Sequence, residues 1–287
     1  MDCYEERIEA ARLALSRADR VIIGAGAGLS AAAGLDYSGP RFTDNFADFI
    51  EKYGLSDMYS ASFYPFGTPE ELWAHWARHI EVNRFAQPAT PLYRELLDLV
   101  QGREYFVITT NVESQFAKAG FPDDRIFEVQ GNYAYLQCAK ACHDKLYYNE
   151  ELIARMLAST RDCSIPHDLV PVCPVCGGNM DVNLRHNEHF VQDKAWHAAS
   201  ERYECFMAKA RESRLVMLEL GVGFNTPGII RYPFENLAYR NKHSRLIRLN
   251  RDEPLGFAET LKETIPFDEE MGKVLRDFSQ GNVLTAN

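Results

Sequence analysis

The chain has 287 residues, a net charge of −10 at pH 7 and an ordinary share of hydrophobic and charged residues, enough for one large or two small globular domains. Its 31 basic residues are scattered without a Lys/Arg block, which argues against nucleic acid or an anionic membrane surface as a partner. No stretch approaches the ~20 apolar residues that cross a bilayer.

The N-terminal segment carries apolar residues at helical spacing over 4–18 among charges of both signs. This pattern predicts a helix, and it differs from a signal or transit peptide. We therefore expect a cytoplasmic protein, where thiols stay reduced. In that compartment the seven cysteines are expected to be metal ligands or isolated thiols rather than disulfides.

A strand, a glycine turn and a helix are predicted over 21–34. The apolar run Val21-Ile22-Ile23 is typical of a strand buried on both faces, and glycines follow at 24, 26 and 28. Ser30, with three alanines after it, is expected near the N-cap of a helix. Free backbone N–H groups and the helix dipole make such a turn a diphosphate site. A tight turn that binds no ligand is the alternative.

The rest of the chain alternates helices and strands around an insertion. Residues 36–66 are expected to be irregular with short helices, and residues 138–180, rich in Cys and Pro, to hold one helix at 150–158. The remaining predicted helices are 69–85, 90–100, a short one ending near 120, 194–212, 228–239 and 269–278, and the remaining strands are 105–109, 126–129, 214–220 and 245–249. This order favours a parallel sheet with helices on both faces.

Ligands of open parallel sheets bind beyond the carboxyl ends of the strands. Glycines and amides dominate those ends: Gly24–Ser30, Thr110-Asn111, Gln130-Gly131, Gly221–Asn225 and Asn250. Because few of these groups ionise, the edge is better suited to a large polar cofactor than to hydrolysis by paired acids.

Four cysteines have the spacing of a structural zinc site. Cys138, Cys142, Cys173 and Cys176 form C-x3-C-x30-C-x2-C, and Pro174 with two following glycines makes the second pair a tight knuckle. We predict a closed zinc site that stabilises residues 134–181. His143 or Cys163 could replace one ligand, and four unligated thiols are the alternative.

These motifs, in this order, resemble the sirtuin family. Gly26-Ala27-Gly28-Leu29-Ser30 followed by AAAG is similar to its first motif, and Thr109–Glu113 (TTNVE) is similar to its Thr-Gln-Asn-Ile-Asp motif. Ala119-Gly120, Gln130-Gly131 at the His-Gly position, the paired cysteines, Gly221 and Asn250 follow in the family's order.

The resemblance implies a Rossmann-type NAD-binding domain with a small zinc-binding and helical domain inserted in the chain. We place the NAD-binding domain at residues 1–39, 87–133 and 182–287. A helical or lid module would occupy 40–86, and a zinc-binding module 134–181.

Departures from the family pattern point to altered chemistry. Family members use the motif histidine as a base on a ribose hydroxyl to complete deacylation, and Gln130 replaces it here. A glutamine cannot take that proton near neutral pH. Asp36-Tyr37-Ser38-Gly39 replaces Pro-Asp-Phe-Arg, and DVNLRHNEHF after Met180 replaces the segment that clamps acyl-lysine. Thr110, Glu113 and Phe116 replace Gln, Asp and His.

Together these substitutions resemble the class M, macrodomain-linked sirtuins of microbes. The resemblance implies NAD-dependent mono-ADP-ribosylation of a protein, with nicotinamide released. The implied acceptor is a lipoylated carrier related to the H protein of the glycine cleavage system. A macrodomain hydrolase that reverses the modification is the implied functional partner.

The resemblance also assigns roles to residues. Asn111 would orient the nicotinamide ribose, and Gln130 would contact the same hydroxyls without deprotonating them; a helix cap and a loop hydrogen bond are their alternatives. The backbone at Ala27 and Gly28 would hold the diphosphate. The other expected NAD contacts are Gly26, Ser30, Ala31, Asp36, Tyr37, Ser38, Thr110, Glu113, Gly221, Gly223, Asn225 and Asn250.

Two other function classes remain open. A protein deacylase or delipoylase would need His186 or His189, in the 183–192 loop, to replace the missing base, unless both are simply solvated. An NAD glycohydrolase would release free ADP-ribose, and an NAD-binding sensor would release no nicotinamide.

Overall fold

The computed structural model describes residues 3–257 and 262–279, and its larger sheet has six parallel strands. Their order is β3 (Ile126–Glu128), β2 (Tyr105–Thr109), β1 (Arg20–Ala25), β7 (Leu215–Leu220), β8 (Arg245–Leu249) and β9 (Thr264–Phe267). The strand order reverses between β1 and β7, which makes their carboxyl ends the expected ligand position of such a sheet. The predicted parallel α/β architecture is confirmed.

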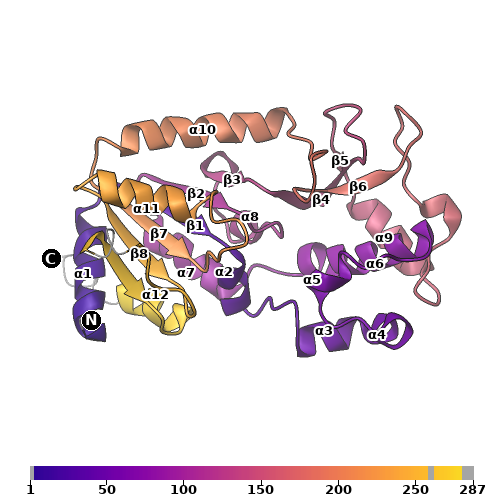
Figure 1. The fold of residues 1–287 in the computed structure, drawn as a ribbon, viewed down its shortest axis with the longest axis horizontal. Coiled ribbons are helices and arrows are strands. Elements are labelled where there is room, and N and C mark those ends of the chain that lie inside the picture. The colour runs from indigo at the N-terminus through magenta and orange to yellow at the C-terminus, as the bar shows by residue number, and fades with distance from the viewer. Residues whose placement is uncertain (1–2, 258–261, 280–287) are drawn as a thin grey trace.

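Helices cover both faces of this sheet (Figure 1). One face packs against α1 (Tyr4–Arg17), α7 (Pro91–Val100) and α12 (Met271–Ser279), and the other against α10 (Lys194–Ala210) and α11 (Arg231–Arg240). Because both faces are covered, the central strands are buried and mostly apolar: Val21, Ile22 and Ile23 are fully buried, and the buried charges Glu219 of β7 and Arg248 of β8 pair with each other.

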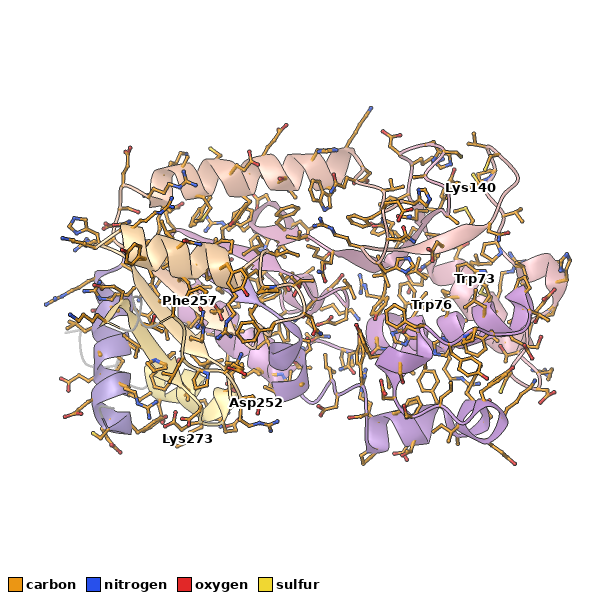
Figure 2. The ribbon with its side chains drawn as sticks, viewed as in Figure 1. Trp73, Trp76, Lys140, Asp252, Phe257 and Lys273 are labelled. Atoms are coloured by element: carbon orange, nitrogen blue, oxygen red, sulfur yellow. The ribbon has the colours of Figure 1, made fainter. Side chains whose placement is uncertain are left out.

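A second core lies beside the sheet and joins two segments far apart in sequence. It contains a three-stranded antiparallel sheet in the order β5 (Tyr147–Tyr148), β4 (Gly131–Cys138), β6 (Met180–Leu184). Its helices are α3 (Pro40–Asn45), α4 (Ala47–Tyr53), α5 (Met58–Ala61), α6 (Pro69–Ile80) and α9 (Glu150–Ser159). Trp73 and Trp76 of α6 are buried in this aromatic core, at the positions labelled in Figure 2.

The structure differs from the sequence prediction in several elements. Strands β4, β5, β6 and β9 were not expected, and the helix expected over 69–85 continues past α6 as a π-helical turn, Glu81–Phe85. Short helices complete the fold: α2 (Ala27–Ala32), α8 (Gln115–Lys118) and the 3₁₀ turns Asp123–Arg125 and His167–Leu169. Within the described ranges, no helix has both the length and the apolar character needed to span a bilayer.

Candidate active site

The glycine turn after β1 has a different helix start from the one predicted. Gly26, in an extended conformation, is the N-cap of α2, so the helix begins at Ala27. Ser30 therefore lies inside the helix rather than near its N-cap, and its side chain is buried. The N-cap prediction for Ser30 is wrong because Gly26 is the N-cap and Gly28 lies inside the helix.

Two glycines bring the first turn of α2 into backbone contact with the turn after β7. The Gly28 N–H donates to the Gly221 carbonyl at 3.0 Å, and a Cβ on Gly221 would lie 2.4 Å from Gly28 backbone atoms. Gly221 also has φ of +60°, a conformation that favours glycine. The Gly28 amide is therefore not free to bind a diphosphate as predicted, whereas the Ala27 amide has no partner among the described residues.

Asn111 lies just beyond β2 with its side-chain nitrogen inside a buried network. Nδ2 donates to the Gly26 carbonyl at 3.0 Å and contacts Ser30 Oγ at 3.0 Å and Tyr93 Oη at 3.2 Å. Because a carbonyl only accepts, the atom facing Gly26 must be the nitrogen. The side chain thus offers its oxygen, and not its nitrogen, to a ligand.

Glu113 is the acceptor on which this network converges. Its Oε1 accepts from Ser30 Oγ at 2.5 Å and Tyr93 Oη at 3.3 Å, and its Oε2 accepts from the Val112 N–H at 3.0 Å. Burial and this carboxylate raise the pKa of Tyr93 well above its usual range. Tyr93 was missed by sequence reasoning, because a tyrosine on the apolar face of α7 gives no sign of a polar role.

Gln130 follows β3 on the neighbouring edge and is half-buried. Its side chain makes no hydrogen bond within the described part of the chain, and its carbonyl accepts from the Arg185 N–H at 3.0 Å. Two residues earlier, Glu128 Oε2 accepts from Asn132 Nδ2 at 2.6 Å. Burial raises the pKa of Glu128 to about 7. Sequence reasoning did not identify Glu128.

Tyr37 anchors the segment 36–38, whose three residues are expected to contact NAD. Its hydroxyl lies 2.8 Å from Tyr133 Oη, and its carbonyl accepts from the Met58 N–H at 2.8 Å. Asp36 and Ser38, on either side, are exposed. Tyr37 is thereby the fixed member of this trio.

Three further residues expected to contact NAD, Gly223, Asn225 and Asn250, lie on two loops. Asn250 Nδ2 donates to the Val222 carbonyl at 3.0 Å, so Asn250 joins the loops after β8 and β7. Gly223 and Asn225 are exposed on the latter loop. The other expected contacts are placed as follows: Thr110 N donates to the Ala25 carbonyl at 3.0 Å, and Ala31 is exposed on α2.

The two loop histidines are not directed toward Gln130 by any hydrogen bond of the described residues. His186 Nε2 lies 2.9 Å from Asp181 Oδ2, and this contact raises the pKa of His186. His189 is exposed beside Glu188. Among the described residues, neither histidine makes the hydrogen bond to Gln130 that would place it as a base beside the ribose.

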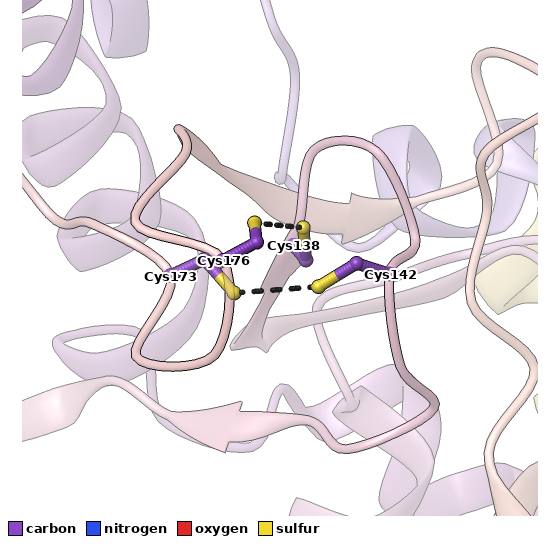
Figure 3. Close-up of side chains that lie close together, drawn as sticks. All are labelled: Cys138, Cys142, Cys173 and Cys176. Carbon is purple, nitrogen blue, oxygen red and sulfur yellow. Dashed lines mark hydrogen bonds between the residues drawn. The ribbon is translucent and has the colours of Figure 1, made fainter.

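The four predicted cysteines form one cluster (Figure 3). Sγ–Sγ distances are 3.8 Å for Cys138 and Cys176 and 3.6 Å for Cys142 and Cys173, and all four sulfurs lie within 4.8 Å of one another. Tetrahedral zinc with Zn–S bonds of about 2.3 Å separates its sulfurs by about 3.8 Å, so the donor set fits zinc. Cys163 lies outside this group, and His143 contacts Cys173 Sγ at 3.4 Å.

Comparison with known proteins gives named relatives. The chain is 38% identical to a protein ADP-ribosyltransferase of Staphylococcus aureus, over 88% of this chain and 80% of that protein. It is 35% identical to a probable bifunctional ADP-ribose hydrolase/ADP-ribosyltransferase of Fusarium oxysporum, over 83% of this chain but only 41% of that protein. No model of a known protein family matches the chain.

Solved structures share the fold. A Sir2 protein with a p53 peptide and NAD⁺ superposes with a TM-score of 0.60 and 20% identity, over 96% of this chain and 99% of that one. At that identity the likeness concerns the backbone architecture, including the large sheet and the smaller inserted unit.

Proposed function

The chain belongs to the sirtuin family. Because its relative at 38% identity is named a protein ADP-ribosyltransferase, we propose that this chain transfers a single ADP-ribosyl group from NAD to a protein acceptor in the cytoplasm. NAD is the co-substrate, and it would lie along the carboxyl edge of the sheet between β1, β2 and β7. The Ala27 amide would face the diphosphate, and the Asn111 side-chain oxygen would accept from a hydroxyl of the nicotinamide ribose.

The observation that supports this proposal most is Gln130 at the position of the family's motif histidine. In transfer, the bond from ribose C1′ to the nicotinamide nitrogen breaks and nicotinamide leaves with the bonding electrons. The acceptor nucleophile bonds to C1′ and loses its proton to solvent. No step needs a base on a ribose hydroxyl. Deacylation does need one, and a glutamine with neither histidine bonded to it supplies none.

The acceptor we propose is a lipoylated carrier protein related to the glycine-cleavage H protein, with a macrodomain ADP-ribosyl hydrolase as functional partner. The resemblance to class M sirtuins supports the acceptor. The Fusarium relative, named for hydrolase and transferase activity in one chain, supports the pairing with a hydrolase. The cysteine cluster would hold a structural zinc that fixes the inserted unit.

One assay tests the function. The protein is incubated with NAD and the lipoylated carrier, and the intact mass of the carrier and the released nicotinamide are measured together. We expect the carrier to gain one ADP-ribosyl group per nicotinamide released. Free ADP-ribose without labelled protein would identify a glycohydrolase, NAD binding without nicotinamide a sensor, and loss of the acyl or lipoyl group a deacylase.

A further inference from the structure

A cavity of about 890 Å³ lies at the amino ends of β7, β8 and β9, at the opposite edge of the large sheet from the candidate active site. Leu215 opens β7, Arg245 opens β8 and Thr264 opens β9, and all three line the cavity. Helix α1, which also lines it, lies on the side of the large sheet away from the inserted unit (Figure 1). Because β7 has six residues, roughly 16 Å of strand separates this cavity from the carboxyl edge.

Positive charge is concentrated at this cavity. Six arginine and lysine side chains line it, and no acidic side chain of the described residues does. The six are Arg7, Arg17, Arg214, Lys242, Arg245 and Lys262. The whole chain has a net charge of −10, so this cluster opposes the overall charge of the protein. A concave surface lined by one sign of charge attracts ligands of the other sign, so the cavity is suited to an anion.

Three of the six cations are already neutralised by carboxylates that do not line the cavity. These pairs are Arg7–Glu269 at 2.6 Å, Arg214–Asp19 at 2.5 Å and Arg245–Glu263 at 2.5 Å. Arg17, Lys242 and Lys262 form neither an ion pair nor a side-chain hydrogen bond with any described residue. They come from the last turn of α1, the turn before β8 and the segment before β9. Their positive charges are therefore available to a ligand.

Between these cations the lining is apolar. Ala10 and Ala14 of α1 and Ile265 of β9 contribute to it. Leu13 and Leu255 line the same cavity with 47% and 43% of their surface exposed, although large apolar side chains are usually buried. Exposed apolar surface rimmed by charge is typical of an interaction site. The cavity is thus suited to a molecule that joins an anionic group to an apolar body.

We propose that this cavity binds a small phosphate monoester whose alcohol part is apolar. Arg17, Lys242 and Lys262 would surround the phosphate, whose charge of about −1.5 to −2 and three free oxygens match three cations better than a carboxylate does. The apolar part would lie against Ala10 and Leu13. The volume falls within the range of about 300–1,000 Å³ that small-molecule pockets occupy, which favours a small ligand over a flat partner surface. NAD has no part in this site.

The test measures the binding of 1-naphthyl phosphate by isothermal titration calorimetry at low salt and about pH 8, where the phosphate is a dianion. Saturating NAD is present, so that the carboxyl edge of the sheet is occupied. Inorganic phosphate and 1-naphthol are the matched probes, because each carries one half of the ligand. We expect 1-naphthyl phosphate to bind about tenfold or more tightly than either, since only this probe uses both parts of the lining.

Five variants locate the bound probe. Arg17→Gln, Lys242→Gln and Lys262→Gln each remove one cation and should raise the Kd roughly two- to fivefold. Lys209→Gln removes an equal charge from an exposed position of α10 outside the lining, and should leave the Kd unchanged. Ala10→Phe, at an exposed position of α1, fills the cavity without changing its charge and should abolish binding. The free energy of unfolding is measured for every variant.

The absence of 1-naphthyl phosphate binding would overturn the proposal. Equal binding of inorganic phosphate or of 1-naphthol would also overturn it, because one half of the ligand would then suffice. An equal effect of Lys209→Gln would indicate unspecific attraction, and unchanged binding by folded Ala10→Phe would place the probe elsewhere. Probe binding that saturating NAD removes would locate the probe at the carboxyl edge. Binding of phosphatidylglycerol vesicles in place of the soluble probe would assign the cations to a membrane surface. Because the readout is binding of a probe other than NAD, failure of the proposed function leaves this test intact.

Discussion

Asn111 Nδ2 lies 3.0 Å from the Gly26 carbonyl oxygen, and this single contact fixes which way the amide of Asn111 faces. Gly26 is the N-cap of α2, so the glycine turn that would hold the diphosphate also orients the residue that would hold the ribose. Cofactor position and Asn111 orientation are thereby coupled through one backbone carbonyl.

This coupling predicts different outcomes for two substitutions at Asn111. Asn111→Ala removes the side-chain oxygen and should abolish nicotinamide release while the protein stays folded. Asn111→Asp places an oxygen against the Gly26 carbonyl, near the Glu113 carboxylate, and should in addition lower the free energy of unfolding by about 1–3 kcal/mol. Nicotinamide release and denaturant unfolding measure the two effects. An Asn111→Ala variant as active as the parent would remove Asn111 from the site.

The contact between Gly28 and Gly221 predicts the effect of a single methyl group. Gly221→Ala puts a Cβ 2.4 Å from the Gly28 backbone at a φ of +60°, so we expect at least about 1–2 kcal/mol of destabilisation and weaker NAD binding. Gly228→Ala is the control, since a Cβ there meets nothing within 4 Å. Calorimetry measures NAD binding and unfolding experiments measure the stability of each variant. Equal stabilities of the two variants would contradict the packing argument.

The parallel strands were predictable because they carry a strong local signal. Tyr105–Thr109 and Arg245–Leu249 were expected and are found at those bounds. Tyr105–Thr109 is a mostly apolar run, typical of a strand buried on both faces, and Arg245–Leu249 has the apolar residues Leu246, Ile247 and Leu249 around the buried Arg248. Strand β9 was missed because Pro266 argues against a strand, yet β9 is the edge strand of its sheet, where proline is tolerated. Strand β4 was missed because its buried and exposed residues do not alternate.

The site was only partly predictable for a different reason. The backbone motifs locate Asn111, Gln130 and the glycines, because their residue types follow from local geometry. Tyr93, Tyr133 and His79 acquire polar roles only through partners far away in the chain, up to 96 residues apart for Tyr133 and Tyr37. The pairing of Glu219 with Arg248 also depends on a partner elsewhere in the chain. Both charges are fully buried, on neighbouring strands, and lie 2.7 Å apart.

The cysteine cluster predicts stoichiometric zinc. Cys173→Ser should lower the zinc content of protein prepared without chelator and loosen residues 134–181, because these residues depend on the four-ligand site. Amide hydrogen exchange should show faster exchange there than in β1 and β2. Cys205→Ser, at an exposed cysteine outside the cluster, is the control and should keep its zinc. Parent protein without zinc would show that the cluster is four free thiols.

Glu128 predicts a pH dependence of stability. Its pKa is raised from 4.5 to about 7 in the folded protein, so the folded state keeps a proton that the unfolded state loses. Stability should therefore fall as pH rises from about 4.5 to 7 and level off above. Glu128→Gln, which cannot ionise, should be more stable than the parent at pH 8 and lose this advantage at pH 5. Melting temperatures across that range check this, with the exposed Glu51→Gln as control; identical profiles for parent and Glu128→Gln would rule it out.

Substitutions at Gln130 test whether the missing histidine alone separates this protein from deacylating relatives. Gln130→His restores a base but leaves the altered 183–192 loop unchanged, so deacylation of acyl-lysine peptides should stay negligible. ADP-ribosyl transfer should persist at a rate roughly threefold to tenfold lower, the cost of one well-placed ribose hydrogen bond of about 0.5–1.5 kcal/mol. Gln130→Ala should be slower still, because truncation leaves the ribose hydroxyl facing a gap. ADP-ribose incorporation from labelled NAD at saturating cofactor ranks the three proteins. Efficient deacylation by Gln130→His would mean that the glutamine alone suppresses that chemistry. Full activity of Gln130→Ala would mean that the Gln130 side chain has no role in the transfer reaction.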